Sequence, residues 1–436
     1  CIRDSSLTAL TLTVAVLCPP AFAQEGTGVR GTFGFSQGVE LEDGEDFFTR
    51  TGLTFGLSSS TRTETFGLSL GTEVLGDFSS DADDTFEANN YNASVRYSRR
   101  GANSGLSFSA TYREFELDDE TIEGVGGETI ISTGEAESIG ANLGLDFGIE
   151  GPLGLELDFA HRETNYTNTT DPDLFDFDTT SADALARFQI SPALTARARA
   201  GIERTDEEDA TSTETEDTYF GVGVETSTAS GLAITADILY DESEVTVTGP
   251  VTTEEDGVGI ELSVTQERPD GSLGFALASR VDETGRRTSA EVSRGFDLRE
   301  GSLALSLGVV DQEGDEDLRL IGSLSLERET RRGALTASLS QEAVTSGGDA
   351  VLSTVLDLGI TQEIDNTSSW SAGIGFAAVD EFAGEYDSRS TARISYTRDL
   401  TADWDMNAGI EYSKDRDESS TNTVFFNIER DFTFGF

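Results

Sequence analysis

The chain has 436 residues and a formal net charge of −53, with 82 acidic residues against 29 basic ones. An anionic protein of this kind repels DNA and RNA, which argues against a role in nucleic-acid binding. Hydrophobic residues make up 36% of the chain and the mean hydropathy is −0.28, values that by themselves suggest a soluble or a disordered protein.

The first 23 residues have the features of a secretory leader. Arg3 precedes a short apolar run over 7–17, and a cleavage site of the A-x-A type ends at Ala23. The run is too short for a membrane-spanning helix, which needs about 20 apolar residues. We therefore expect residues 1–23 to be an N-terminally incomplete signal peptide.

Both cysteines of the chain, Cys1 and Cys18, fall inside this leader. The mature chain then has none, which excludes disulfides, thiolate catalysis and Cys-based metal sites. No composition break divides the remainder. We expect residues 24–436 to form a single domain.

From residue 29 onward, apolar residues alternate with small or polar ones. A period of two predicts β-strands with one apolar and one polar face. The first such segment places Phe33 and Phe35 on one face and Thr32 and Ser36 on the other. In chain order, the predicted strand cores are 29–35, 53–57, 66–70, 93–97, 106–112, 139–147, 153–159, 182–190, 194–202, 220–224, 232–240, 258–264, 273–281, 290–296, 303–309, 318–326, 335–339, 352–360, 370–378, 392–396, 406–412 and 424–436.

The connectors alternate between short turns and longer, acid-rich loops. All five prolines of the mature chain lie in connectors, as a closed sheet requires. Aromatic residues gather near both ends of the strands, as in the girdles of a membrane barrel. The predicted fold class is all-β: a closed antiparallel transmembrane β-barrel of about 22 strands (range 18–24). We expect short periplasmic turns, longer acidic extracellular loops and no plug domain.

The chain ends on Phe432, Phe434 and Phe436, with an aromatic residue at every second position. This ending resembles the C-terminal signal of Gram-negative outer-membrane β-barrel proteins. The resemblance is to this porin-like class as a whole and not to one particular family. Arg430 interrupts the apolar alternation, which could mark a bulge or an edge position. The resemblance implies an outer-membrane location, contact with outer-membrane lipid and lipopolysaccharide, and recognition of these phenylalanines by the barrel-assembly machinery.

More than half of the acidic residues lie in the eleven long connectors, whereas arginines such as Arg62, Arg268 and Arg299 gather at the short turns. One rim of the barrel is therefore predicted to be strongly anionic and to attract cations. A solvated acidic surface explains these loops more simply than specific metal sites do. We expect the protein to have no cofactor. The weak candidates for Ca²⁺ or Mg²⁺ association at the outer loops are Asp81, Asp83, Asp84, Asp171, Asp173, Asp315 and Asp317.

The polar face of the strands carries charges of both signs, which would be costly against lipid and are predicted to line the lumen. The alternative is that they neutralise one another and stiffen the wall. The pore-lining candidates are Arg113, Glu156, Asp158, Arg187, Arg197, Arg199, Glu225, Asp237, Glu261, Arg280, Arg319, Asp357, Arg393 and Glu411.

These features lead to the hypothesis of a passive outer-membrane channel for small solutes or ions, favouring cations through its acidic outer mouth. The alternatives are a surface-exposed recognition or adhesion barrel and a polysaccharide export pore. The chain is not expected to be an enzyme, because His161 is its only histidine and no nucleophile motif accompanies it. The transported solute and the oligomeric state are not encoded in any motif that we recognise.

Overall fold

The structure, a computed structural model, describes residues 28–43, 46–78, 85–117, 122–123, 129–130, 132, 134–169, 174–209, 212–247, 251–314, 317–346, 349–381, 386–416 and 420–435. The predicted leader, the terminal Phe436 and most of the acidic metal candidates (Asp81, Asp83, Asp84, Asp171, Asp173 and Asp315) lie outside these residues. None of the described residues forms a helix that is long and apolar enough to cross a membrane.

The described chain forms 24 β-strands, of which 22 build one sheet. They are β1 (Val29–Glu42), β2 (Asp46–Ser60), β3 (Glu64–Asp77), β4 (Thr85–Arg100), β5 (Ser104–Glu116), β6 (Ile122–Glu123), β7 (Thr129–Ile130), β8 (Glu135–Phe147), β9 (Leu153–Thr167), β10 (Phe177–Ser191), β11 (Leu194–Glu207), β12 (Thr213–Ser227), β13 (Leu232–Val247), β14 (Val251–Arg268), β15 (Gly271–Asp282), β16 (Gly285–Leu298), β17 (Gly301–Gln312), β18 (Arg319–Thr330), β19 (Gly333–Ser346), β20 (Asp349–Asp365), β21 (Ser368–Glu381), β22 (Tyr386–Asp399), β23 (Trp404–Asp415) and β24 (Thr421–Gly435).

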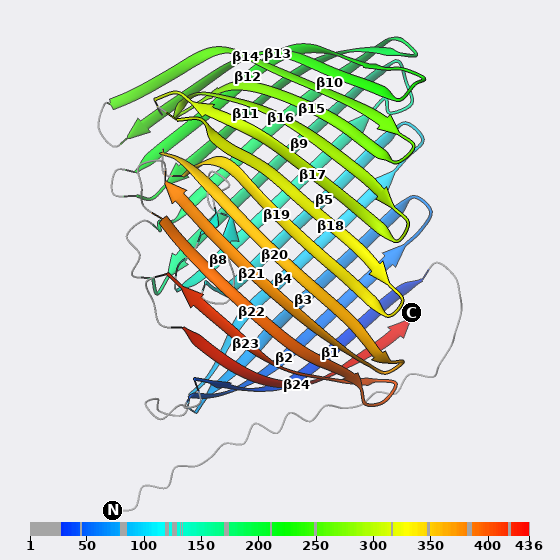
Figure 1. Cartoon of the computed structure of the whole chain (residues 1–436), viewed down its shortest axis with the longest axis vertical. Helices are drawn as coiled ribbons and strands as arrows, with labels where there is room; N and C mark the ends of the chain where they lie inside the picture. Colours follow the sequence, from blue (N-terminus) through cyan, green and yellow to red (C-terminus); the bar gives the residue numbers. More distant parts are fainter. Residues whose placement is uncertain are drawn as a thin grey trace, which may run out of the picture.

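Each strand of the sheet pairs antiparallel with the next one along the chain, and the last strand closes on the first. At this seam β1 pairs with both β2 and β24, with Gly31 opposite Phe434 and Phe33 opposite Phe432. Figure 1 shows the resulting barrel of tilted strands. Closure leaves no edge strand with unpaired backbone groups, a condition for crossing a bilayer with strands.

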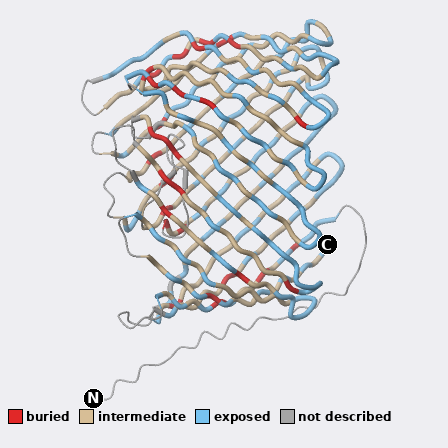
Figure 2. Tube along the Cα trace, in the orientation of Figure 1, coloured by how far each residue is buried: buried red, intermediate tan, exposed pale blue. Residues whose placement is uncertain are grey.

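The barrel has little buried core, and most of its wall is intermediate or exposed (Figure 2). Large apolar side chains on the outward face are widely exposed, such as Val222 at 65% and Leu307 at 66%. On a water-soluble protein such a continuous apolar surface would be a liability, whereas lipid covers it in a membrane barrel. The predicted architecture of a closed barrel with 22 antiparallel strands is thus confirmed.

The structure also departs from the predicted connectors. Residues 117–135, expected to be a long loop, contain a short hairpin in which β6 and β7, each of two residues, pair with one another. Strand β7 lies beside β21, on the other side of the lumen from β5. The connector between β15 and β16 is a tight turn at Glu283 and Thr284, shorter than its neighbours. The absence of a plug domain stays a prediction, because the described residues do not test it.

Candidate functional site

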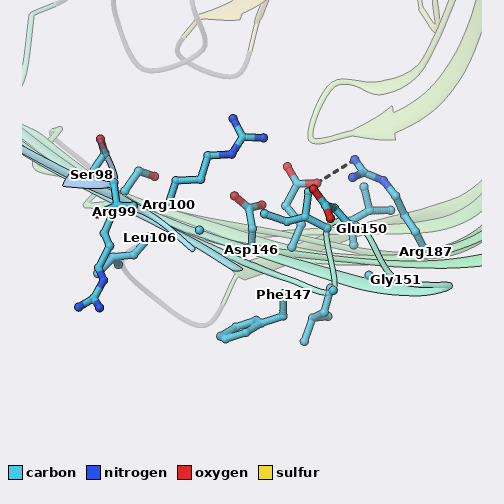
Figure 3. Close-up of a pocket in the computed structure, with 18 of the residues that line it drawn as sticks. Ser98, Arg99, Arg100, Leu106, Asp146, Phe147, Glu150, Gly151 and Arg187 are labelled. Atoms are coloured by element: carbon cyan, nitrogen blue, oxygen red, sulfur yellow. Dashed lines mark ion pairs between the residues drawn. The ribbon is translucent and has the colours of Figure 1, made fainter. Parts of the chain in front are cut away.

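The end of the barrel that carries the short turns holds a cavity of about 810 Å³, lined by these turns and by strand ends from β3 to β11. Arg99 and Arg100, which both line the cavity, point to opposite sides of β4 (Figure 3). Arg187 forms an ion pair with Glu156 on its wall, at 2.8 Å. Acidic and basic groups therefore mix at this end of the barrel, in contrast to the acidic outer loops.

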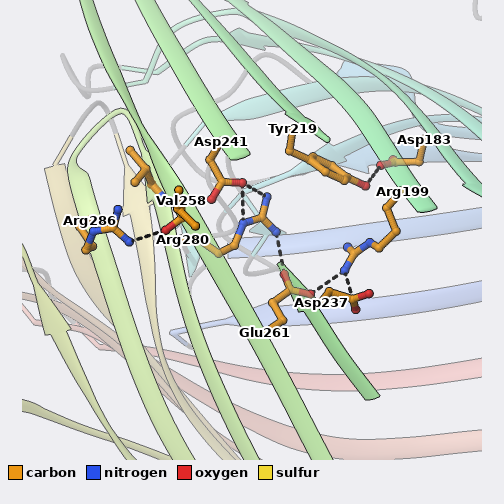
Figure 4. Close-up of polar contacts among 10 residues, drawn as sticks. Asp183, Arg199, Tyr219, Asp237, Asp241, Val258, Glu261, Arg280 and Arg286 are labelled. Carbon is orange, nitrogen blue, oxygen red and sulfur yellow. Dashed lines mark hydrogen bonds and ion pairs between the residues drawn. The ribbon is translucent and has the colours of Figure 1, made fainter. Parts of the chain in front are cut away.

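A larger group of charges lies on the inner face of strands β11 to β15 (Figure 4). We call it the lumenal charge network: Arg197, Arg199, Asp237, Asp241, Glu261 and Arg280. Arg199 Nη1 donates to Glu261 Oε2 at 2.5 Å, and Arg280 Nη1 donates to the other oxygen of that carboxylate at 2.7 Å. Glu261 thus joins the two arginines into one chain of ion pairs.

The two aspartates anchor this chain at either end. Arg280 Nε donates to Asp241 Oδ1 at 2.9 Å, while Arg197 and Arg199 each place a nitrogen 3.5 Å from Asp237 Oδ2. Both aspartate side chains are only 2% exposed. Buried carboxylates are tolerated only when they are paired, so each arginine here compensates a charge that water cannot reach.

Glycine makes these contacts geometrically possible. Arg197, Gly223 and Asp237 form one row of register partners across β11, β12 and β13. A Cβ atom at Gly223 would collide with Asp237 Oδ1, and one at Gly259 would collide with Asp241 Oδ2. Each glycine therefore leaves a gap in the middle strand through which charges from its two neighbours meet.

Tyr219 on β12 lies over the centre of the network. Its hydroxyl donates to Asp183 Oδ1 at 2.5 Å, again across a glycine strand position. The guanidinium carbons of Arg199 and Arg280 lie 5.4 and 5.0 Å from the centre of its ring. Such cation–π contacts fix the orientation of both arginines.

A second feature crosses the lumen. Leu117 and Ser132, which flank the β6–β7 hairpin, each place a backbone carbonyl against Arg389 on β22, at 2.6 and 3.2 Å. Along the wall β5 and β22 are separated by β4, β3, β2, β1, β24 and β23. Arg389 is 4% exposed and also holds Asp415 through two hydrogen bonds of 2.8 and 2.9 Å.

The near end of this crossing segment is fixed by apolar packing. Phe115, Leu117 and Ala136 are buried together, with Tyr166 and Leu174 packed against them. The connector is therefore held at its base by an apolar cluster and on the other wall by an arginine. The sequence predicted an acidic outer loop here, and its composition did not indicate that both of its ends contact the inner wall of the barrel.

Comparison with known proteins agrees with this architecture. Residues 98–263 match the family model described as the outer membrane protein beta-barrel domain. The chain is a Gram-negative outer-membrane β-barrel protein. A search of curated proteins finds no match to its sequence.

Several solved structures share the barrel's fold at low identity. The iron transporter FrpB from Neisseria meningitidis has a TM-score of 0.62 at 9% identity, covering 94% of this chain and 83% of that one. The import receptor Fiu for ferric catecholate from E. coli K12 has a TM-score of 0.58 at 9% identity, covering 94% and 82%. The ferric enterobactin receptor PfeA from Pseudomonas aeruginosa has a TM-score of 0.55 at 10% identity, also covering 94% and 82%.

These neighbours correct the predicted function. The outer-membrane location is confirmed, but the hypothesis of a passive channel is wrong, because proteins with this architecture are an iron transporter and receptors for ferric compounds. The physical reason is width: barrels of 22 strands are too wide for side chains to fill, and transporters of this size carry a plugged lumen.

The structure brings some of the predicted pore-lining residues together and leaves others apart. Arg197, Arg199, Asp237, Glu261 and Arg280 join the lumenal charge network, and Arg187 pairs with Glu156. Arg393 pairs with Glu411 at 3.3 Å, far along the wall. Arg113 lies over the ring of Phe115, and Ser338 donates to Asp357 at 3.5 Å. Asp158, Glu225 and Arg319 lie elsewhere on the wall, outside the network.

The sequence prediction missed Asp241, Tyr219 and Arg389 as site residues. Asp241 and Tyr219 continue the inward alternation of their strands, which was the available signal, but they fall where connectors were expected to begin. Of the metal candidates only Asp317 is described. Among the described residues, no three His, Cys, Asp or Glu side chains are arranged to hold a metal ion.

Two titrating groups in the turns have displaced pKa values. A hydrogen bond from Arg294 lowers the pKa of Asp270 in the β14–β15 turn. In the β15–β16 turn, burial and the nearby charge of Asp217 raise the pKa of Glu283 to about 7. Glu283 and Asp217 are therefore acidic groups whose charges act on one another without full compensation by arginine.

Proposed function

We propose that this barrel takes up a specific, positively charged ligand from the cell exterior rather than serving as an open channel. The single observation that carries the proposal is the segment tied across the lumen by Arg389, because free diffusion of solutes needs an unobstructed path. The shared fold with transporters and receptors for iron compounds supports a ligand-uptake role.

The negative charge of the chain supports a positively charged ligand. The chain carries a net charge of −53, and its outer connectors are rich in carboxylates. Such a rim raises the local concentration of cations and repels anions. The arginines of the lumenal charge network do not change this sign, because each is bound to carboxylates of the same wall.

The proposal assigns no catalysis and no bound cofactor to the chain. His161 lies on β9, where its Nδ1 is 3.0 Å from Thr180 Oγ1 of the neighbouring strand β10. Both side chains lie on the face that carries the exposed apolar residues Phe159 and Leu155. A role in holding strands together near the membrane surface accounts for this contact.

Swelling of liposomes that contain the purified barrel tests the proposal. We expect the wild-type protein to admit arabinose slowly, and Arg389→Gln to admit it faster because the crossing segment loses its far anchor. Arg393→Gln is the matched control, since Arg393 lies on the same strand and its exposed pair with Glu411 makes no contact with that segment. Swelling by the wild type as fast as by a general porin would overturn the proposal.

A further inference from the structure

The outward face of strands β1 to β5 is hollowed. The hollow has a volume of about 660 Å³ and lies among side chains of the apolar, outward alternation. It follows one row of register partners, with one residue from each strand: Phe33, Phe55, Leu70, Ala93 and Tyr112. Aromatic rings stand at both ends of this row, whereas Ala93 has its smallest side chain. The depression therefore forms over Ala93, between larger neighbours.

A β-bulge in β4 shapes the side of the hollow toward the long connectors. Two residues of β4, Asn90 and Tyr91, lie opposite the single residue Thr72 of β3, where the register shifts. Asn90 has a left-handed backbone, with a φ of 53°, and its amide donates to Glu73 Oε2 at 3.1 Å. Thr72 Oγ1 donates to the backbone carbonyl of Asn89 at 3.4 Å. These contacts hold the bulge, which directs Tyr91 to the wall of the hollow.

The occupant of the hollow comes from the membrane. The hollow is continuous with the outward apolar face, which lipid covers in a membrane barrel. None of the described residues that line it is basic, so it does not attract a free phosphate or carboxylate. Left empty, it would deprive Phe55 and Leu70 of packing contacts on one side. The broad convex wall of a second barrel cannot enter it, whereas a flexible hydrocarbon chain can.

The hollow has a polar end, and this end lies on the side of the long connectors. Tyr91 precedes Ala93 on a strand that runs away from those connectors, and Glu114 follows Tyr112 on a strand that runs toward them. Tyrosine combines an apolar ring with a hydroxyl group and favours the boundary between membrane and water. The apolar floor over Leu70 and Ala93 thus matches a hydrocarbon chain, and the hydroxyl groups match an acceptor at the head of that chain.

We propose that this hollow binds one acyl chain of a membrane lipid, from the leaflet on the side of the long connectors. Ala93 leaves the room that the chain fills. Tyr91 and Tyr112 donate to the carbonyl oxygen that joins the chain to the rest of the lipid. The site lies outside the lumen, so it does not depend on the proposed uptake function.

Native mass spectrometry of the full-length barrel, extracted from its membrane into detergent, counts the lipids that stay bound. We expect the wild type to retain lipid through detergent washing. We expect Ala93→Phe, which fills the hollow, to retain at least tenfold less, and Tyr91→Phe, which loses only a hydroxyl group, to retain severalfold less. Ala408→Phe is the matched control, because Ala408 lies between the outward residues Tyr396 and Phe426 and does not line the hollow. Heat-modifiable mobility verifies that each variant is folded.

Fluorescence quenching locates the bound chain. Trp370 and Trp404, the two tryptophans of the chain, are first replaced by phenylalanine. Phe33→Trp then places a single reporter at the hollow, and we expect phosphatidylethanolamine with brominated acyl chains, titrated in detergent, to quench it saturably. Phe220→Trp is the control reporter, since Phe220 is 64% exposed on the outward face of β12 and does not line the hollow. We expect its quenching to rise only in proportion to the added lipid.

Three results would overturn the inference. The first is a folded wild type that retains detergent but no lipid. The second is retention by Ala93→Phe or Tyr91→Phe equal to that of the wild type and Ala408→Phe. The third is the same quenching curve at both reporter positions. Because none of these measurements involves transport, free swelling of liposomes would refute the proposed uptake function and leave the lipid site standing.

Discussion

At the scale of single residues, Arg280 is the side chain that compensates the buried charge of Asp241. It bonds both Asp241, whose side chain is 2% exposed, and Glu261. Replacing it with glutamine leaves the buried Asp241 without its cation and leaves Glu261 with Arg199 alone. We expect Arg280→Gln to lower the free energy of unfolding by about 3–5 kcal/mol, measured by urea titration in lipid vesicles.

Arg393→Gln supplies the comparison for this prediction. The Arg393–Glu411 pair has the same chemistry on the same inner face, but its side chains are 52% and 36% exposed. Exposed pairs contribute about 0–1 kcal/mol because water screens them. Equal losses of stability in the two variants would show that burial does not set the strength of the lumenal charge network.

Glu283 makes stability depend on pH. Its pKa is raised from 4.5 to about 7 in the folded barrel, by burial first and by Asp217 second, with Asp282 adding to the shift and Arg287 opposing it. The folded state therefore binds a proton that the unfolded state releases between these two pH values. We expect the stability contributed by this group to fall as pH rises from about 4.5 to 7, by up to about 3 kcal/mol.

Urea titrations of the wild type and Glu283→Gln at pH 4.5 and pH 8 measure this effect. The variant has no carboxyl group to titrate, so we expect it to lose less stability over this range and to be the more stable protein at pH 8. Parallel pH profiles of the two proteins would contradict the assignment of the raised pKa to Glu283.

Arg430 shows how alternation predicts a residue's direction and fails to predict its neighbours. The interrupted pattern suggested a bulge or an edge position, yet β24 pairs with β1 without a register shift through Arg430, and its pairing with β23 extends as far as Arg430. Its guanidinium carbon instead lies 4.3 Å from the centre of the Phe432 ring and 5.4 Å from that of Trp404, and it pairs with Asp403. A long basic side chain thus reaches from an outward position to the interfacial aromatic residues.

At the scale of strands, the gap at Gly223 lets β11 and β13 exchange charges across β12. Alanine there would place a Cβ atom against Asp237 Oδ1 and the carbonyl oxygen of Ala236. We expect Gly223→Ala to destabilise the barrel by about 1–3 kcal/mol, because a buried carboxylate and a backbone strand must shift. The folded fraction in urea, read from heat-modifiable mobility, measures this loss.

Gly67→Ala is the control for this variant. Gly67 lies on β3, and a Cβ atom built there meets nothing within 4 Å. The same substitution in open space removes conformational freedom from the unfolded chain, so we expect no loss of stability. A destabilisation of Gly67→Ala as large as that of Gly223→Ala would indicate a general cost of alanine in these strands.

Most of this element-level architecture was predictable, because alternation has a period that a strand imposes on every residue. The 22 predicted strand cores correspond to the 22 strands of the sheet. The β6–β7 hairpin was not predictable, since two-residue strands carry no periodic signal. Its anchor, Arg389, lies more than 250 residues from Leu117 and Ser132 in sequence, and no local pattern connects positions that meet across a lumen.

At the scale of the molecule, only part of the candidate site could be predicted, because local sequence patterns do not show which distant residues meet. The alternation of residues along each strand predicted that Arg199 and Glu261 face the lumen. It could not predict that they pair, because β12 and β13 lie between their strands, β11 and β14. That pairing depends on the tilt of the barrel and on side-chain length. Fold class and location follow from local periodicity, whereas the site depends on the curvature of the closed wall.

Closure itself is the property of the whole molecule that remains to be tested, at the seam between β1 and β24. The ring of Phe434 covers Gly31, its register partner, so closely that a Cβ atom on Gly31 would collide with it. Phe434 therefore has two separable roles: it seals the seam, and it belongs to the predicted signal for the assembly machinery. Phe434→Ala removes both, whereas Gly31→Val displaces the ring and leaves the C-terminal sequence intact.

We expect both variants to fold less completely than the wild type into pure lipid vesicles, because each loses the contact between ring and glycine that an aromatic side chain provides across strands. With vesicles that contain purified assembly machinery, we expect Gly31→Val to recover most of its folded fraction and Phe434→Ala to recover little. Heat-modifiable mobility on gels measures both fractions. Equal recovery of the two variants would mean that Phe434 acts through the seam alone, and the predicted assembly signal would then have to reside in the other terminal aromatic residues.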